Sequence, residues 1–430
     1  MKKIGLSIVA LLLFPLVSLS QSFLIPGIPN QGMFMGGLGV SVIDDTSYFV
    51  FNFRPEIAVG KIGVGLDIPL RFNISTGDLR KQDWDETYDY FRIIRYVRYG
   101  HKGDPFYTRV GTLDAARIGH GFIMNFYRNE LNYDQRKIGL ELDADFGAFG
   151  FESVTSNFGR AEILGFRGYY RPLHGLTIPI IRNFAIGGSY VIDVDPDQNR
   201  STSDDVAVFG LDVELPLIRT GLIRTLLYAD WAKFRGFGSG QAVGIEVSLH
   251  GIGGIFNFVG QLERRFLGEQ FVPAFFNPFY EKERFQLVGG QPVRKYDMLP
   301  TLTQATRGTY GLLYGSILNI VEILGTFEKQ DDVPKSGILN LQATVPDALP
   351  SISARATYSR TAIDGFADAF KLDERSVARL GIGYKVYPFL IVYLDYIWTF
   401  KYDPVSQTYS TQKRFEPQIA FVYPFQFVKK

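Results

Sequence analysis

The chain has 430 residues, of which 45 are basic and 44 acidic, so its formal net charge is +1. This balance gives no signal for nucleic-acid binding. The chain contains no cysteine, which excludes disulfides, a thiolate catalyst and a cysteine-ligated metal site. Its mean hydropathy of +0.03 fits a soluble protein, but residues that face lipid and water alternately average to the same value. The pattern along the chain therefore has to decide the class.

The N-terminus has the features of an export signal. Lys2 and Lys3 precede the apolar run 4–17, and Ser18-Leu19-Ser20 places small residues before a cleavage point. This arrangement predicts a Sec-type signal peptide over residues 1–20, cleaved after Ser20. No cysteine follows, so no lipoprotein anchor is expected. Beyond residue 21, no apolar run approaches the roughly 18–20 residues that a transmembrane helix needs.

Runs of alternating apolar and polar residues follow along the rest of the chain. A period of two places successive side chains on opposite faces of a strand. In the run 207–215, Leu211 and Val213 share one face, and Asp212 and Glu214 share the other. Runs of about ten residues are long enough to cross a bilayer as tilted strands. The clearest of them are 62–73, 138–146, 207–215, 243–249, 378–386 and 390–401.

The connections between these runs alternate between short and long. The short ones are 59–63, 101–105, 146–150, 171–183, 214–223, 250–254, 315–319, 345–351 and 387–390. The long or polar ones are 75–90, 113–135, 156–161, 194–205, 233–239, 266–307, 330–336, 361–375 and 403–412. This asymmetry is typical of a transmembrane antiparallel up-and-down β-barrel with short periplasmic turns and long extracellular loops. We therefore expect one all-β domain over residues 21–430, a barrel of about 18–20 strands.

The last run, 415–427, alternates strictly between apolar or aromatic residues and the rest. It resembles the C-terminal signal of bacterial outer-membrane barrels, although the stretch 428–430 follows the final aromatic. The alternation, the loop asymmetry and this strand together resemble porin-like outer-membrane proteins. The resemblance implies the outer membrane of a diderm bacterium, contact with its lipid and lipopolysaccharide, and insertion by the barrel-assembly machinery through this strand. An edge strand of a large soluble β-protein is the alternative, and a homo-oligomer is left open.

The face opposite the apolar one carries charges of both signs. The acidic candidates for lining a pore are Glu141, Asp143, Asp145, Asp212, Glu214, Glu322 and Glu328. The basic candidates are Arg71, Arg167, Arg355, Arg379 and Lys385. Opposed rows of this kind create a transverse field that selects solutes by charge and dipole. We therefore expect a channel for passive diffusion or facilitated uptake of small hydrophilic solutes. The alternative is that these charges pair and fill the lumen of a plugged structural, anchoring or surface-binding barrel.

Two long connections have unusual sequences. The segment 266–307 contains FVPAFFNPFY at residues 271–280, a stretch too apolar for a solvated loop, so we expect the segment to fold inward or cap the pore. Alternatively, 271–280 completes a further hairpin of the wall. The segment 119–134 is a second candidate for a constricting loop.

The stretch 193–205 reads DVDPDQNRSTSDD. Asp193, Asp195, Asp197 and Asn199 occupy positions 1, 3, 5 and 7 of a calcium-loop spacing, with Asp204 at position 12. Position 6 lacks the glycine of such loops, and no flanking helices are expected, so a plain acidic surface loop is the alternative. No other cofactor is expected.

An outer-membrane hydrolase is the remote alternative function. Such an enzyme needs a histidine beside a serine or an aspartate at the outer rim. Of four histidines, only His120 falls on a long connection, with Asp114 nearby in sequence and without a G-x-S-x-G motif. We therefore expect no catalytic residues and no enzymatic activity.

Overall fold

The computed structural model describes residues 31–43, 46–85, 90–91, 93–129, 137–199, 201–202, 204–252, 256–288, 291–318, 320–345, 351–373, 375–387, 390–403 and 408–426. The expected signal peptide, residues 1–20, lies outside these residues, and so does the stretch 427–430 with the last aromatic of the C-terminal run.

The first half of the wall consists of β1 (Gln31–Ile43), β2 (Thr46–Val59), β3 (Ile62–Leu66), β4 (Ile68–Asn73), β5 (Ile94–Tyr99), β6 (Phe106–Gly111), β7 (Gly139–Asp145), β8 (Phe149–Thr155), β9 (Ile163–Tyr170) and β10 (Ala185–Asp193). The second half consists of β11 (Val206–Arg219), β12 (Ile223–Phe234), β13 (Ser239–Ile252), β14 (Phe256–Leu267), β17 (Thr306–Ile317), β18 (Val321–Gln330), β19 (Gly337–Val345), β20 (Ile352–Ile363), β21 (Ser376–Tyr387), β22 (Leu390–Asp403) and β23 (Thr408–Gln426).

Helical structure is confined to the connections. Within the described residues it includes the short helix α2 (Tyr280–Glu283), the 3₁₀ turns η1 (Lys81–Asp83), η2 (Ile181–Asn183), η3 (Lys295–Thr301) and η4 (Phe366–Asp368), and helical residues at 90–91. No helix within the described residues is long and apolar enough to span a membrane.

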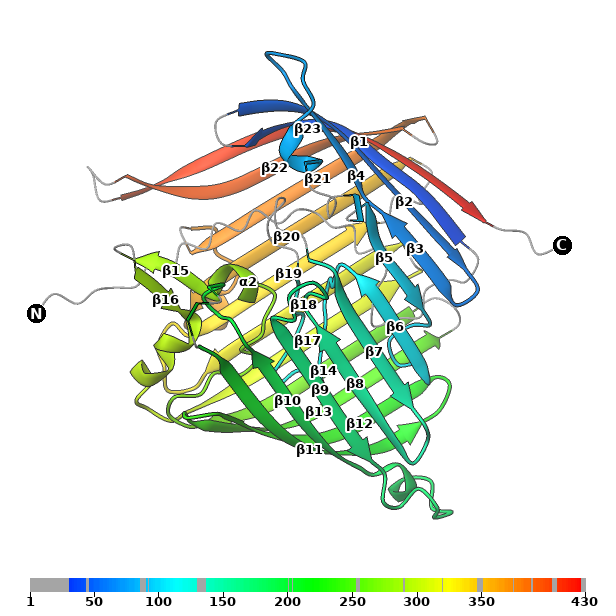
Figure 1. Cartoon of the computed structure of the whole chain (residues 1–430), viewed down its shortest axis with the longest axis vertical. Coiled ribbons are helices and arrows are strands. Elements are labelled where there is room, and N and C mark those ends of the chain that lie inside the picture. The colour runs from blue at the N-terminus through cyan, green and yellow to red at the C-terminus, as the bar shows by residue number, and fades with distance from the viewer. Residues whose placement is uncertain are drawn as a thin grey trace, which may run out of the picture.

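The wall is a closed ring of antiparallel strands (Figure 1). Its sheet has 21 segments, but β3 and β4 both pair with β2 on either side of a break at Asp67 and form one strand of the ring. The ring therefore has 20 strands. β1 closes it by pairing with β23, with Leu38 opposite Ile419. The prediction of an up-and-down barrel of this size is confirmed.

The outer surface of the ring is apolar because alternate side chains point outward. On β11, Leu211 is 59% exposed, whereas the next residue, Asp212, is only 6% exposed. On β21, Ile382 and Tyr384 are exposed, and on β23 Ile419 is exposed as well. An apolar exterior around a polar interior is the reverse of a soluble fold, and it suits a barrel surrounded by lipid.

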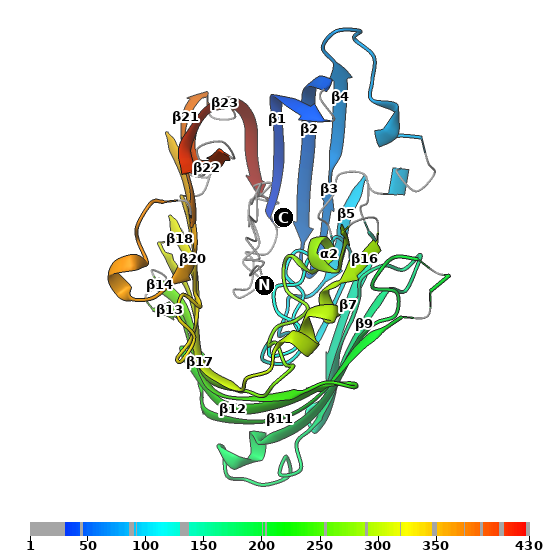
Figure 2. The same ribbon diagram turned by 90° about the vertical axis from the view of Figure 1, so that its left-hand side faces the viewer.

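The connections alternate in length along most of the chain, as the sequence predicts, although β1 and β2 are separated by only two residues at the end where the other connections are long. At one end, here called the short-turn end, the longest connection joins β9 to β10 through residues 171–184. At the opposite, long-loop end, the connections β6–β7 and β14–β17 reach from 112 to 138 and from 268 to 305. Figure 2 shows α2, which belongs to the second of these, within the ring of strands.

Both long connections fold into the barrel and form its largest apolar core. The segment 112–129 contributes Ile123 and Met124, and the segment 268–305 contributes Phe275 and Phe276. The two segments also contact each other, because the backbone N–H of Asn125 donates a hydrogen bond to the Phe276 carbonyl. The expectation that 266–307 folds inward is therefore confirmed.

The alternative of an extra wall hairpin over 271–280 is wrong. The hairpin in this connection is instead β15 (Phe285–Val288) with β16 (Gln291–Arg294), which form a separate two-stranded sheet. The aromatic residues before it pack on inward-facing wall residues such as Val208 and Phe234. Burial of these rings against the wall outweighs the extension of the barrel by one more hairpin.

We predict that a cation on the outer face destabilises the barrel far more than one on the inner face. Leu211→Lys places an ammonium in the lipid, at a cost of about 2–4 kcal/mol near the midplane. Thr357→Lys, on the polar inner face of β20, is the matched control and costs much less. Urea titrations of folding into lipid vesicles measure both. Equal losses for the two variants would contradict a lipid-facing surface at Leu211.

Candidate functional site

The tip of the segment 112–129 reaches deep into the lumen and is held there by buried polar contacts. His120 Nδ1 lies 3.0 Å from an Asp230 carboxylate oxygen, and Nε2 lies 3.3 Å from Glu214. Its ring stacks on Tyr228 at a centroid distance of 4.0 Å. The Gln261 side-chain amide donates to the His120 carbonyl at 3.1 Å. One residue thus joins the loop to strands β11, β12 and β14.

A second set of contacts fixes the residue beside His120. The Gly119 amide donates to Glu152 on β8 at 2.8 Å. Arg167 on β9 donates to the same Glu152 at 2.8 Å and to Asp212 at 2.9 Å. Gly119 has a φ of +55°, and a Cβ there would lie 3.2 Å from the Arg167 side chain. Both the turn and the close approach of the guanidinium therefore require glycine.

The segment 268–305 is anchored by a fully buried guanidinium. Arg284 follows α2, has no exposed side-chain surface, and donates to both oxygens of Asp193 at 2.7 and 2.8 Å. It also donates to Glu162 at 2.5 Å. The Tyr280 hydroxyl adds a hydrogen bond to Asp193 at 2.9 Å. A buried guanidinium is tolerable only when carboxylates pair with it closely, so these contacts define where the loop sits.

A cavity of about 400 Å³ lies between the loop tip and the short-turn end. His120 and Arg117 line it from the loop, and charged side chains of β7, β9 and the neighbouring turns line it from the wall. Lys102 lies 3.0 Å from Asp143, and Arg171 lies 2.7 Å from Asp145. Arg219 and Arg224, also in the lining, are exposed. The cavity therefore presents both signs of charge close together.

The inner wall on the other side of the ring is polar and remains half exposed. Asn340 and Gln342 on β19 and Thr357 on β20 face inward and are only partly buried. Arg355 and Arg379 both donate to Asp395 on β22, at 2.5 and 2.8 Å. Two guanidinium groups thus share one carboxylate on this wall.

The structure distributes the predicted pore-lining residues over several places in the interior. Asp212, Glu214 and Arg167 form one cluster around the tip of the segment 112–129. Asp143 and Asp145 lie in the cavity, and Glu141, near Lys102, lies at its edge. Arg355 and Arg379 share Asp395 on the opposite wall. The remaining four are Arg71, paired with Asp83 of a long connection, Glu328, paired with Arg265, and the half-buried Glu322 and Lys385.

Sequence analysis missed several residues that hold the interior together. On β14, Gln261, Glu263 and Arg265 share the inward face and are all buried. Their period-two spacing was a usable signal, but the run 256–267 also contains Arg264, which interrupts the alternation. Asp230 and Arg284 gave no local signal, because their partners are distant in sequence.

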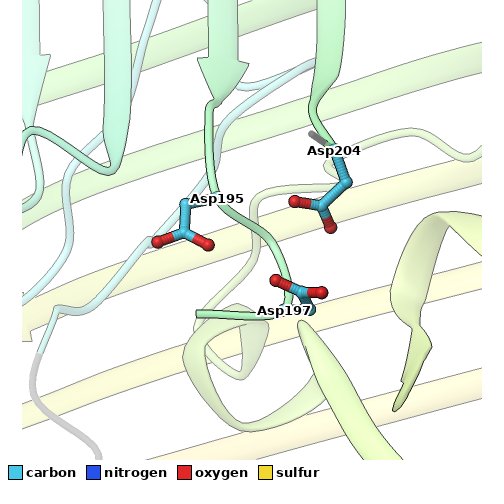
Figure 3. Close-up of side chains that lie close together, drawn as sticks. All are labelled: Asp195, Asp197 and Asp204. Carbon is cyan, nitrogen blue, oxygen red and sulfur yellow. The ribbon is translucent and has the colours of Figure 1, made fainter. Parts of the chain in front are cut away.

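The acidic residues of the connection between β10 and β11 lie in two different environments. Asp193 is bound by Arg284 and Tyr280. Asn199 is exposed, and its side-chain oxygen accepts from the Ser201 amide. Asp195 and Asp197 instead converge with Asp204, with carboxylate oxygens within 4.8 Å of one another (Figure 3). Burial and the neighbouring Asp197 raise the pKa of Asp204.

His120 and Asp114, the residues behind the hydrolase alternative, are not partners of each other. Asp114 pairs with Arg109, while His120 is held between Asp230 and Glu214. Two carboxylates on one imidazole stabilise a fixed cation and do not activate a hydroxyl nucleophile. The contacts of His120 therefore assign it to positioning the loop.

Comparisons with known proteins identify no family for this chain. No protein-family model matches the chain, and no curated protein matches its sequence. Among solved structures, the outer membrane protein opdK from Pseudomonas aeruginosa matches with a TM-score of 0.34 and 10% identity, over 93% of this chain and 98% of that chain. The siderophore receptor PirA from Acinetobacter baumannii matches with a TM-score of 0.41 and 8% identity, over 92% and 80%. Similarity at this level does not indicate a solute, so the membrane-barrel assignment rests on the closed ladder and the apolar exterior.

We predict that Arg284→Ala destabilises the protein strongly. The change leaves Asp193 and Glu162 buried without their guanidinium, a defect worth about 3–5 kcal/mol. Equilibrium unfolding of the protein in vesicles measures the loss. Arg219→Ala, at an exposed position, is the control and should change stability by less than about 0.5 kcal/mol. Similar effects of the two changes would show that Arg284 does not anchor the loop.

We predict that His120 is protonated at neutral pH. Burial lowers the pKa of its ring, but Asp230 and Glu214 raise it, and the resulting value is about 10. Its contribution to stability is therefore complete below the unfolded value of 6.5 and is lost as the pH rises through about 10.

Selective ¹³C labelling of the four histidines tests this value by NMR. One resonance should titrate near pH 10, and His120→Gln should remove it. A His120 resonance that titrates near 6.5 would mean that the two carboxylates do not contact the ring.

Proposed function

We propose that this protein is an outer-membrane channel for small hydrophilic solutes, with a lumen narrowed by two inward-folded loops. The observation that carries this proposal is the contrast between the two sides of the inner wall. Val208, Ala232 and Phe234 are at most 1% exposed beneath the loops. Asn340 and Thr357 on the other side stay partly exposed, with none of the described loop segments packed on them in the apolar core. Polar side chains left accessible along a barrel wall suit a water-filled path.

The orientation in the membrane follows from the connections. Long loops of such barrels face the exterior and short turns face the periplasm. The charged cavity would then lie at the periplasmic mouth, beneath the loop tip that carries His120. Lipid and lipopolysaccharide would surround the apolar exterior, and β23 would carry the signal for the barrel-assembly machinery.

The charges in the cavity favour solutes with both donor and acceptor groups. Lys102 beside Asp143 and Arg171 beside Asp145 offer cationic and anionic groups within one cavity. A transverse arrangement of this kind aligns a dipolar solute and disfavours an apolar one. The substrate class we propose is therefore small, hydrophilic and polar at both ends.

A plugged barrel that anchors or binds a partner is the second candidate. The apolar core formed by the segments 112–129 and 268–305 against the wall favours it. Arg284 and His120 hold both segments through buried contacts, so neither would move aside without cost. The two candidates differ in whether the uncovered side of the lumen conducts ions.

Conductance of the refolded protein in a planar bilayer separates the two candidates. For a channel, we expect reproducible single steps in KCl. The double change Asp143→Asn and Asp145→Asn removes two negative charges beside Lys102 and Arg171, so the reversal potential in a KCl gradient should shift toward anions.

Asp78→Asn, on the exposed connection after β4, is the matched control and should leave the ion preference unchanged. Silent insertion, with folding confirmed by the heat-dependent gel shift, would refute the open channel and favour the anchoring role. If the double variant conducts with unchanged ion preference, the cavity does not lie on the path that ions take through the barrel.

A further inference from the structure

We infer that Asp195, Asp197 and Asp204 form a calcium-binding site at the long-loop end of the barrel. The inference does not depend on the proposed channel function. All three residues lie in the connection between β10 and β11, and their carboxylate oxygens lie within 4.8 Å of one another. Figure 3 shows the three carboxyl groups turned toward a common point.

The decisive observation is the state of Asp204. Its side chain is only 3% exposed, yet neither carboxylate oxygen has a hydrogen-bond partner among the described residues. The nearest cation is the Arg294 guanidinium at 3.6 Å, beyond hydrogen-bond distance. Arg294 makes its own hydrogen bonds to Asp297, both at 3.1 Å. A buried carboxylate without donors is costly and points to a missing positive charge.

The rest of the cluster leaves the same deficit. Asp195 accepts one hydrogen bond from Arg160 at 3.1 Å, and its other oxygen is buried without a partner. Asp197 accepts hydrogen bonds from the Thr202 hydroxyl and the Asn199 backbone N–H, which are neutral donors. Among the described residues, two guanidinium groups therefore face three converging carboxylates: Arg160 lies 3.1 Å from Asp195 and Arg294 lies 3.6 Å from Asp204. Like charges at this separation repel strongly in a poorly hydrated site, and a divalent cation relieves the repulsion.

The ligand chemistry selects calcium. The cluster offers carboxylate oxygens and no imidazole or thiolate, which excludes a zinc-type or copper-type donor set. Its ligands come from an irregular connection without a fixed octahedral geometry, and calcium accepts such variable arrangements more readily than magnesium does. Sites of this type on extracellular modules bind calcium with dissociation constants on the order of 10⁻⁴–10⁻³ M.

The site differs from the set of residues that the calcium-loop spacing predicts. Asp193 is unavailable because Arg284 occupies both of its oxygens. Asn199 points its side-chain oxygen at the Ser201 amide. The proposed site therefore keeps positions 3, 5 and 12 of the spacing, whereas position 1 is in a buried salt bridge and position 7 is hydrogen-bonded to the backbone.

Calcium binding to the full-length mature protein tests the inference directly. The protein is refolded in a zwitterionic detergent without lipopolysaccharide, so that cations bridging lipid phosphates do not contribute. Equilibrium dialysis with radioactive calcium should show one saturable ion per chain. Asp197→Asn and Asp204→Asn should each weaken this binding at least tenfold. Asp332→Asn, at an exposed position on another long connection, should bind as the wild type does, and excess magnesium should compete poorly.

Folding of each variant is checked by the heat-dependent gel shift. If Asp204→Asn does not fold, Asp204→Glu keeps the charge but changes its reach, and it should also weaken binding. No saturable calcium binding by the wild type up to about 10 mM, above the range of such sites, would overturn the inference. Unchanged binding by Asp197→Asn and Asp204→Asn would overturn it as well, because the ion would then sit elsewhere.

Discussion

The closed backbone ladder is the constraint on which the rest of this structure depends. Lipid offers no partner to a backbone amide or carbonyl, so every strand needs two neighbours and the first must meet the last. β1 satisfies this requirement by pairing with β23. A ring of 20 strands encloses more space than the wall side chains can fill. The inner face therefore becomes a second surface, which needs either water or protein against it.

The chain meets that need differently on the two sides of the ring. Beneath the inward loops the wall carries apolar residues such as Val208 and Phe234, and aromatic rings of the segment 268–305 cover them. The polar backbone of these loops is brought inside only because buried groups such as Arg284 and His120 hold it with several bonds each. On β19 and β20, inward side chains such as Asn340 and Thr357 are polar and only partly buried, so water is the better partner there.

The strands of the barrel wall could be predicted from the sequence, but the side-chain contacts inside the barrel could not. Alternation identified the strands because each residue's face depends only on its neighbours, as at Leu211 and Asp212. The inward fold of 266–307 was predictable from the aromatic stretch 271–280, because exposing that many apolar side chains to water is unfavourable. Charge pairing was not predictable, because Asp193 and Arg284 are 91 residues apart. Their meeting depends on strand register and loop path together, and neither is encoded near either residue.

The same long-range pairing decides which acids of the connection after β10 remain for an ion. A guanidinium carries one charge, and Arg284 places it on both oxygens of Asp193. Its one further contact with the connection among the described residues is a hydrogen bond to the Asp195 backbone carbonyl, which leaves the Asp195 carboxylate without this charge. Asp195, Asp197 and Asp204 are left to converge with too little positive charge. A cation bound there would fix the connection within a few residues of the point where Arg284 fixes the segment 268–305. Calcium binding would thus stabilise the same short stretch of chain that holds the segment 268–305 in place.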